Sequence, residues 1–265
     1  PSIYNHLKQF VSINSNKSKG LVNRDDQGDF WWELRPCDYY SEFKKPKIVW
    51  QEISIASEYY WDDLGIFYLS NTAYLLGNSS KDLLLILNSR LIESIFSLIS
   101  QFLSGGFRHT KQYIEKIPIR LPSKPIYYGM VVDYLLFLNS TEERRQNLQH
   151  IITFYDKQIA DSLVYELYFK DKFYKDGLYK EPKEYLAELI LKHLKPIDYD
   201  NWSKLYWKKQ IEGLSRDEEK ELESLERENL AIINEVFEKI QNDREILNQI
   251  EKIRSHKWVK IIENM

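Results

Sequence analysis

The chain is poor in the residues on which many metal sites and membrane segments depend. It contains one cysteine, Cys37, which excludes an internal disulfide and a cysteine-based zinc site. Its five histidines are scattered without metal-ligand spacing. No run approaches the ~20 consecutive apolar residues of a transmembrane helix, and no signal peptide opens the chain. We therefore expect a cytoplasmic protein with no membrane partner and, because it begins at Pro1, a fragment of a longer polypeptide.

Glycine is also scarce, with nine residues in 265. There is no Gly-x-Gly-x-x-Gly turn, Walker loop, Gly-x-Ser-x-Gly elbow or His-Glu-x-x-His pair. The glycine-rich cofactor turn and the Asn/Asp-Pro-Pro-aromatic loop needed for adenine methylation are missing as well. We therefore assign no catalytic residue, metal ligand or cofactor to the chain itself.

What is present is a large apolar and aromatic content, 43% and 14% of residues, which indicates a folded core. The net charge of -3 is unevenly spread, since residues 1–124 carry a slight excess of Lys and Arg and residues 125–265 an excess of Asp and Glu. If one half contacts nucleic acid, the first half is therefore favoured.

The stretch from Asp82 to Pro122 dominates the pattern. Apolar residues at helical spacing predict one helix up to Ile99, followed by the Gly105-Gly106 break and the basic patch Arg108–Lys111. A short strand is predicted for Tyr113–Ile119. Periodicity alone favours an ordinary core helix and a polar turn. The alternative is a rigid anchor that holds a basic loop against DNA.

The rest of the chain predicts an α+β fold in two domains, a strand-containing domain at 1–124 and an all-helical domain at 125–265. The first would hold short mixed strands around the central apolar helix, with Ser140 and Ser215 opening capping boxes in the second. A break is expected near 241–244. Besides a helix at Ile3–Val11, the predicted elements of the first domain are a strand at 48–55, a strand or strand pair at 67–76 with a bend at Ser70–Thr72, and a strand or tight aromatic segment at 29–34.

Basic and amide side chains interleaved with aromatic residues suggest a DNA-binding surface in the first domain. Expected phosphate contacts are Lys44, Lys45, Lys47 and Lys111. Residues expected to read bases, or to position the loop that does, are Gln51, Asn71, Thr72, Arg108 and His109. The competing interpretation is a solvated strand entry for Lys44-Lys45 and core packing for the aromatics.

Two other function classes stay open. Glu42-Phe43-Lys44 and Glu181-Pro182-Lys183 have the Glu-x-Lys spacing of restriction nucleases, a pattern that arises readily by chance in a chain with 29% charged residues. The long amphipathic segment from Ser215 to Met265 could instead serve a helical protein-interaction module.

Several segments occur in an order that resembles a known family. They are Lys45–Ser54 (KPKIVWQEIS), Tyr68–Tyr74 (YLSNTAY), Leu83–Leu91 (LLLILNSRL), Gly106 through Ile117–Ile119, the upstream Ile3–Lys8 and Phe30–Arg35, and the downstream Ile159–Tyr168. Together they resemble the TaqI-like specificity domain at the C-terminal end of adenine-specific DNA methyltransferases and combined restriction–modification enzymes. The resemblance covers roughly residues 1–170.

This resemblance implies recognition of double-stranded DNA. In such enzymes a separate N-terminal domain binds S-adenosylmethionine and methylates the adenine, while the specificity domain selects the site. That catalytic domain would be a partner within the same polypeptide. Neither the recognised sequence nor an endonuclease activity of the parent follows from the residues.

Overall fold

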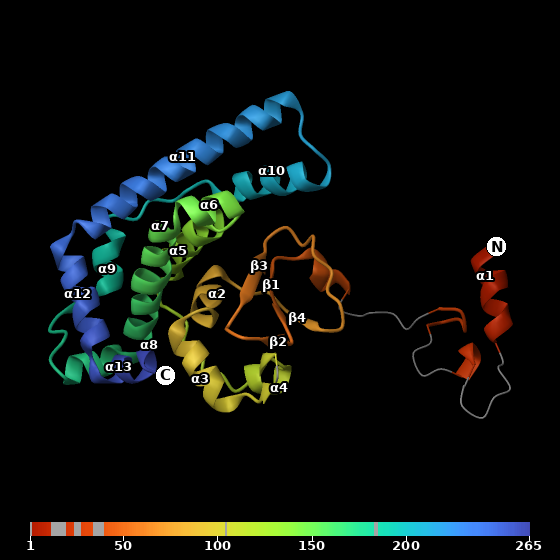
Figure 1. The fold of residues 1–265 in the computed structure, drawn as a ribbon, viewed down its shortest axis with the longest axis horizontal. Helices are drawn as coiled ribbons and strands as arrows, with labels where there is room; N and C mark the ends of the chain where they lie inside the picture. The colour runs from red at the N-terminus through yellow and green to blue at the C-terminus, as the bar shows by residue number, and fades with distance from the viewer. Residues whose placement is uncertain (1, 12–19, 24–27, 34–39, 104, 183–184) are drawn as a thin grey trace. The chain divides into compact units, whose positions relative to one another are not determined.

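The computed structural model describes residues 2–11, 20–23, 28–33, 40–103, 105–182 and 185–265. The chain divides into two compact units, Pro1–Lys44 and Lys45–Met265, each described separately below (Figure 1). Two small antiparallel sheets stand beside many helices, so the predicted α+β class is confirmed.

The first unit consists of short helical turns and an aromatic turn. Its helical elements are α1 (Ser2–Leu7), η1 (Lys8–Phe10), η2 (Leu21–Asn23) and η3 (Tyr40–Lys44). The rings of Phe30 and Trp32 stack with centroids 4.7 Å apart, and Tyr4 meets Trp32 edge-on at 5.2 Å. Residues 28–33 form a tight aromatic turn rather than a strand, because the Gly28 N–H donates to the Glu33 carbonyl at 3.1 Å. Leu34, the end of that prediction, lies outside the described residues.

The second unit begins with a three-stranded sheet in the order β3 (Tyr59–Asp62), β1 (Lys47–Gln51), β4 (Ala73–Gly77). Ile48 and Trp50 alternate with Lys47 along β1, so they point to the opposite face, where both are buried. Of the strand or strand pair predicted at 67–76, only the part from Ala73 is a strand, and the bend predicted at Ser70–Thr72 is present as a turn.

A smaller sheet has the order β2 (Ile53–Ser54), β6 (Gly106–Arg108), β5 (Phe102–Leu103). Gly106 pairs closely with β2 at a φ of +137°, and a Cβ there would lie 2.4 Å from the Ser54 carbonyl oxygen. Only glycine fits this position. The basic patch therefore begins in a strand, which corrects the expectation of a glycine-hinged loop.

The apolar helix between the sheets is two helices, α2 (Lys81–Leu87) and α3 (Arg90–Ile99). Asn88 ends the first, with its Oδ1 accepting from the Tyr59 N–H at 3.0 Å and its Nδ2 donating to the Tyr59 carbonyl at 2.9 Å. Ser89 is the N-cap of the second. These two polar residues stabilise the break that apolar spacing alone did not predict.

The strand predicted at Tyr113–Ile119 is wrong. The segment begins with helix α4 (Lys111–Ile114) and continues as turns and irregular chain. Tyr113, Ile114 and Ile117 pack against the core at a spacing of three to four residues, which suits a helical turn rather than a strand.

Helices make up the rest of the second unit. They are α5 (Pro125–Leu138), α6 (Glu142–Asn147), α7 (Gln149–Thr153), the π-helical turn η4 (Phe154–Ala160), α8 (Asp161–Lys175), α9 (Leu186–Leu191), α10 (Tyr199–Ile211), α11 (Arg216–Gln241), α12 (Arg244–Ser255) and α13 (Lys257–Glu263).

The ends of these helices can be compared with three predictions from the sequence. The Ser215–Glu218 capping box and the break after Gln241 are confirmed. The capping box predicted at Ser140 is wrong, since the N-cap of α6 is Thr141, whose hydroxyl accepts from the Arg144 N–H at 3.1 Å. No helix of the described residues is both long and apolar enough to cross a membrane.

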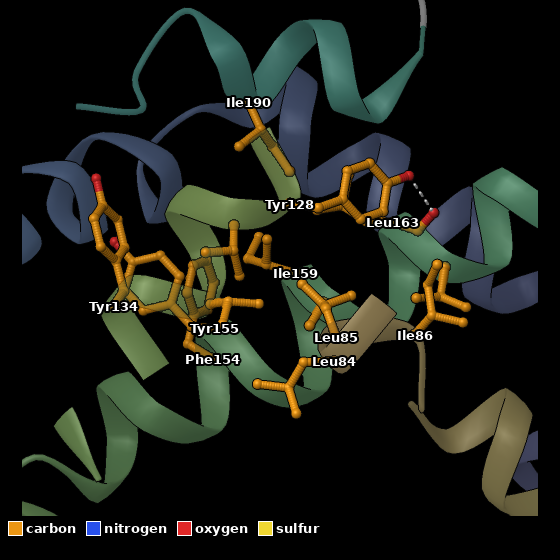
Figure 2. Close-up of a cluster of buried hydrophobic side chains, with 14 of the residues drawn as sticks. Leu84, Leu85, Ile86, Tyr128, Tyr134, Phe154, Tyr155, Ile159, Leu163 and Ile190 are labelled. Atoms are coloured by element: carbon orange, nitrogen blue, oxygen red, sulfur yellow. Dashed lines mark hydrogen bonds between the residues drawn. The ribbon is translucent and has the colours of Figure 1, made fainter. Parts of the chain in front are cut away.

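One hydrophobic core joins the strand-containing and helical parts of residues 45–265. In Figure 2, Leu85 of α2 lies among side chains of α5, η4 and α8, and the Tyr128 hydroxyl donates to the Leu163 carbonyl at 3.2 Å. The boundary proposed at 124/125 separates two fold types and stays a prediction as a domain boundary.

Candidate nucleic-acid interface

The two sheets meet at Glu52, the single residue between β1 and β2. Its backbone N–H donates to the Thr72 carbonyl at 2.8 Å, and its carbonyl accepts from the His109 N–H at 2.6 Å. Two segments far apart in sequence, around Thr72 and His109, are thus fixed to one residue. We call Gln51, Glu52, Asn71, Thr72, Arg108 and His109 the sheet junction.

Arg108 is held to this point by its side chain. Its Nε and Nη2 both lie 2.9 Å from Glu52 Oε1. The pair is open to solvent, with side-chain exposures of 42% for Arg108 and 22% for Glu52. A guanidinium that is already oriented by a carboxylate is suited to a planar, bidentate contact.

His109 is a core residue of the junction. Its ring is buried and stacks on Phe96 with centroids 4.1 Å apart, and its carbonyl accepts from the Trp50 Nε1–H at 2.8 Å. Burial lowers the pKa of the imidazole to about 4, so the ring is neutral at pH 7. The imidazole cannot reach a base in this structure, while its backbone positions the segment that carries Arg108 and Lys111.

The other junction side chains face solvent. Gln51, Asn71 and Thr72 are exposed, and the Thr72 hydroxyl lies 3.1 Å from that of Ser70 in a tight turn. Lys111 follows two residues after His109 and is 79% exposed, 3.4 Å from Glu115. Four of the five residues with a predicted role in readout are therefore at least partly exposed, while the fifth, His109, is buried.

The remaining lysines lie elsewhere. Lys47 is fully buried at the far end of β1 in an ion pair with Asp62, so it cannot contact a phosphate here. Asp62 also accepts from the backbone N–H groups of Ile66 and Phe67 at 3.1 and 3.0 Å, which makes Lys47 part of a structural network. Lys44 and Lys45 are exposed.

Lys45 lies in a bend two residues before β1, toward the end of the strand opposite Gln51. Lys44 ends η3 in the first unit.

The nuclease motifs gain no geometric support. Within the described ranges there is no group of three or more His, Cys, Asp and Glu residues placed to hold a metal ion. Lys183 of the second Glu-x-Lys match lies outside the described residues.

Sequence reasoning missed Glu52 itself. An acidic residue that interrupts the apolar alternation between Trp50 and Ile53 was the available signal. It also missed the exposed apolar side chains around the second sheet, Ile53, Ile55 and Phe102.

Comparison with known proteins finds a match to one family model. Residues 5–119 match the family model described as the TaqI-like C-terminal specificity domain. No curated protein and no solved structure matches the chain. The matched segment includes the whole sheet junction and Lys111. Residues 5–119 are therefore similar to the TaqI-like C-terminal specificity domain.

Proposed function

We propose that this chain is the DNA-recognition part of a type II restriction–modification N6-adenine methyltransferase. It binds duplex DNA through the sheet junction and directs a catalytic domain of the same polypeptide to its site. The match of residues 5–119 is the observation that carries the proposal. S-adenosylmethionine would bind in that catalytic domain, and the protein would act in the cytoplasm.

The junction supplies the chemistry that such a role needs. Arg108, Gln51 and Asn71 carry the side-chain groups that pair with base edges in the major groove. Lys111 adds a cation for the phosphate backbone. The strand segments that present these residues are fixed by the hydrogen bonds of Glu52, so the readers are held in one arrangement before DNA arrives.

The assembly alternative is less well supported. A helical interaction module would offer the apolar face of its long helix to another subunit. In α11, however, Ile233, Val236 and Ile240 are fully buried within this chain. The face that would bind a partner is already packed.

The first test concerns base readout. Selection of duplexes from a randomised pool by residues 1–265 should enrich a short defined sequence. Arg108→Ala should lower the preference for one base pair of that sequence by ~1–3 kcal/mol, because a bidentate contact is lost. The preference is measured by fluorescence anisotropy with matched and singly altered duplexes. If no sequence is enriched after repeated rounds of selection, the proposal is contradicted.

The second test concerns phosphate contact. Lys111→Ala should weaken binding to all duplexes and reduce the slope of log K against log salt by about one. Lys220→Ala is the matched control, since Lys220 is also exposed and paired with a helical carboxylate. It lies on α11, which Figure 1 shows well away from α4. Equal salt slopes for the two variants would show that Lys111 does not contact a phosphate.

The parent enzyme is tested separately. If the reading frame upstream of Pro1 encodes an Asn-Pro-Pro-Tyr-type loop behind a glycine-rich turn, the methyltransferase assignment is supported. A frame without these motifs would contradict it while leaving DNA recognition open to the binding tests.

A further inference from the structure

Strand β2 and the residue after it have an inverted distribution of polar and apolar side chains. An antiparallel strand with one face on the core usually carries apolar residues inward and polar residues outward. In β2 the inward residue is Ser54, which is buried and whose hydroxyl donates to Glu58 Oε2 at 2.9 Å. Ile53 before it and Ile55 after it are 41% and 81% exposed. Two isoleucines therefore face solvent, where they add little to the core.

Ile53 lies beside Arg108, the proposed base reader. The two residues are directly opposite each other in the antiparallel pairing of β2 with β6. Opposite residues point to the same face of a sheet, with Cβ atoms ~5 Å apart. The Arg108 guanidinium is also fixed by Glu52, the residue before Ile53. A cation and an aliphatic side chain are thus presented together next to the sheet junction.

The start of β6 contributes no side chain on the side of these isoleucines. A Cβ on Gly105 would meet Ile53 Cγ2 at 3.6 Å, and one on Gly106 would lie 2.8 Å from the Ile55 backbone nitrogen. Because both positions are glycine, neither adds a side chain that would cover Ile53 or Ile55. Their apolar surface is therefore accessible to a partner, as their exposure shows.

The chemistry of a DNA duplex offers one suitable group to these side chains. In the major groove, base edges present hydrogen-bond donors and acceptors, which an isoleucine cannot pair. The apolar group among these edges is the C5-methyl of thymine. Base pairs stack ~3.4 Å apart, so two side chains ~5 Å apart on a sheet reach base pairs no more than about two steps apart. A guanine read by Arg108 would therefore have a thymine close to it.

We propose that Ile53, with Ile55 beside it, contacts the C5-methyl group of a thymine within two base pairs of the guanine read by Arg108. This inference rests on the proposed duplex recognition and adds a specificity-determining contact to it. It assigns the exposed side chains of β2 to DNA rather than to a second copy of the chain. The reason is continuity with the proposed DNA surface, since Ile53 adjoins Glu52 in the chain and Arg108 across the strand pair.

Replacing thymine by uracil removes only the methyl group and so tests the contact. In the duplex enriched by residues 1–265, each thymine near the base pair identified with Arg108→Ala is replaced in turn by deoxyuridine. One replacement should weaken binding by the natural chain about fourfold, which corresponds to the ~0.8 kcal/mol of one buried CH₂-sized group. Fluorescence anisotropy measures the affinity of each duplex.

Variants at three isoleucines assign the effect. Ile53→Ser should bind the thymine and uracil duplexes equally, whereas Ile53→Val keeps a branched apolar side chain and should keep most of the difference. Circular dichroism melts check that each variant is folded. Ile55→Ser should reduce the difference in the same direction, and it still tests the contact if Ile53→Ser does not fold. Ile211→Ser is the matched control and should retain the fourfold difference, because Ile211 is also exposed but ends helix α10, outside both sheets.

The outcomes separate this inference from the proposed function. If a sequence is enriched but no uracil replacement weakens binding, or if the folded Ile53→Ser and Ile55→Ser keep the full difference, the inference is overturned while duplex recognition stands. An enriched sequence with no thymine within two base pairs of the Arg108 position overturns it as well. If no sequence is enriched, both proposals fail.

Analytical ultracentrifugation tests the competing occupant of this face. The natural chain and Ile53→Ser should sediment alike in the absence of DNA. Self-association that is abolished by Ile53→Ser, together with no effect of uracil, would assign the exposed isoleucines to a second copy of the chain and overturn the inference.

Discussion

The two sheets of the second unit each contain one lysine or arginine paired with a carboxylate, and the two pairs lie in opposite surroundings. In the first sheet, Lys47 and Asp62 are 0% and 1% exposed. In the second, Arg108 at the end of the central strand β6 and Glu52 just before β2 are 42% and 22% exposed. The same charge combination therefore stabilises the fold in one place and remains open to a ligand in the other.

The difference has a physical origin. A buried charge must keep its partner, because removing one member leaves the other without water or a counter-ion. An exposed pair contributes little to stability, because water replaces either partner readily. We therefore expect substitutions in the first pair to unfold the protein and substitutions in the second to alter binding alone.

The largest effect is expected for Lys47→Met. It leaves the Asp62 carboxylate buried and uncompensated, which should lower the free energy of unfolding by ~3–5 kcal/mol. Urea denaturation measures the change. Lys47→Met combined with Asp62→Asn should recover part of the loss, because the neutral amide leaves no buried charge and its one oxygen can still accept from one of the Ile66 and Phe67 N–H groups. A loss below ~1 kcal/mol for the single variant would mean that Lys47 is accessible to water.

Gly106→Ala should have the next largest effect, and it acts on the second sheet. Its methyl group would clash with the Ser54 carbonyl at a φ that alanine rarely adopts, so we expect a loss of at least ~2 kcal/mol. Gly105→Ala is the control, since its added Cβ would meet only Ile53 at an ordinary 3.6 Å. Thermal melts of both variants should differ clearly. Equal melting temperatures would contradict the close pairing of β2 with β6.

Lowering the pH should reduce the free energy of unfolding through His109, which is buried under the sheet junction. Its pKa is lowered to about 4 by burial, while an unfolded histidine titrates near 6.5. Between these values the unfolded chain binds a proton that the folded chain does not. The stabilisation by neutral His109 is therefore complete above about pH 6.5 and is lost as the pH falls towards 4, by on the order of 2 kcal/mol.

Asp133 and Asp161 act in the opposite direction over the same range, because burial raises each pKa to about 6. The measurement is therefore a difference: the free energy of unfolding at pH 7 minus that at pH 4.5, for the natural chain and for His109→Gln. The natural chain should show the larger drop on acidification. Identical drops would mean that His109 is already solvated.

The smallest effect on stability is expected for Arg108→Met. The exposed pair with Glu52 should contribute less than ~1 kcal/mol to the free energy of unfolding. The same variant should nevertheless lose base preference in the duplex experiments. A stability loss as large as that of Lys47→Met would show that the two pairs do not differ in role.

Sequence patterns predicted the elements whose periodicity is strong. The long helices α10 to α12, the Ser215 capping box and the break after Gln241 follow directly from apolar spacing and cap chemistry. The fold class was predictable for the same reason. Strand β3 was missed because it forms by pairing with β1. The break at Asn88-Ser89 was missed because Asn88 makes its hydrogen bonds with Tyr59, 29 residues away.

The predictions for the candidate site also divide into those that residue type could support and those that depend on the fold. Residue type identified Gln51, Asn71, Thr72, Arg108 and Lys111 as polar groups at the surface, and the fold brings the segments of the first four together at Glu52. Lys47 was predicted to contact phosphate because it is a basic residue that flanks an apolar strand segment. Its partner Asp62 is brought opposite it by the register of β1 and β3, which local sequence does not encode.

The shared core has a consequence for recombination between relatives. Ser94 of α3 donates to the backbone carbonyl of Ile262 at 3.3 Å, so α3 contacts helix α13 close to the end of the chain. A crossover that exchanged only the segment matched by the family would pair each α2 and α3 with helices shaped for another sequence. We expect specificity to be transplanted between such proteins only when residues 45–265 travel together.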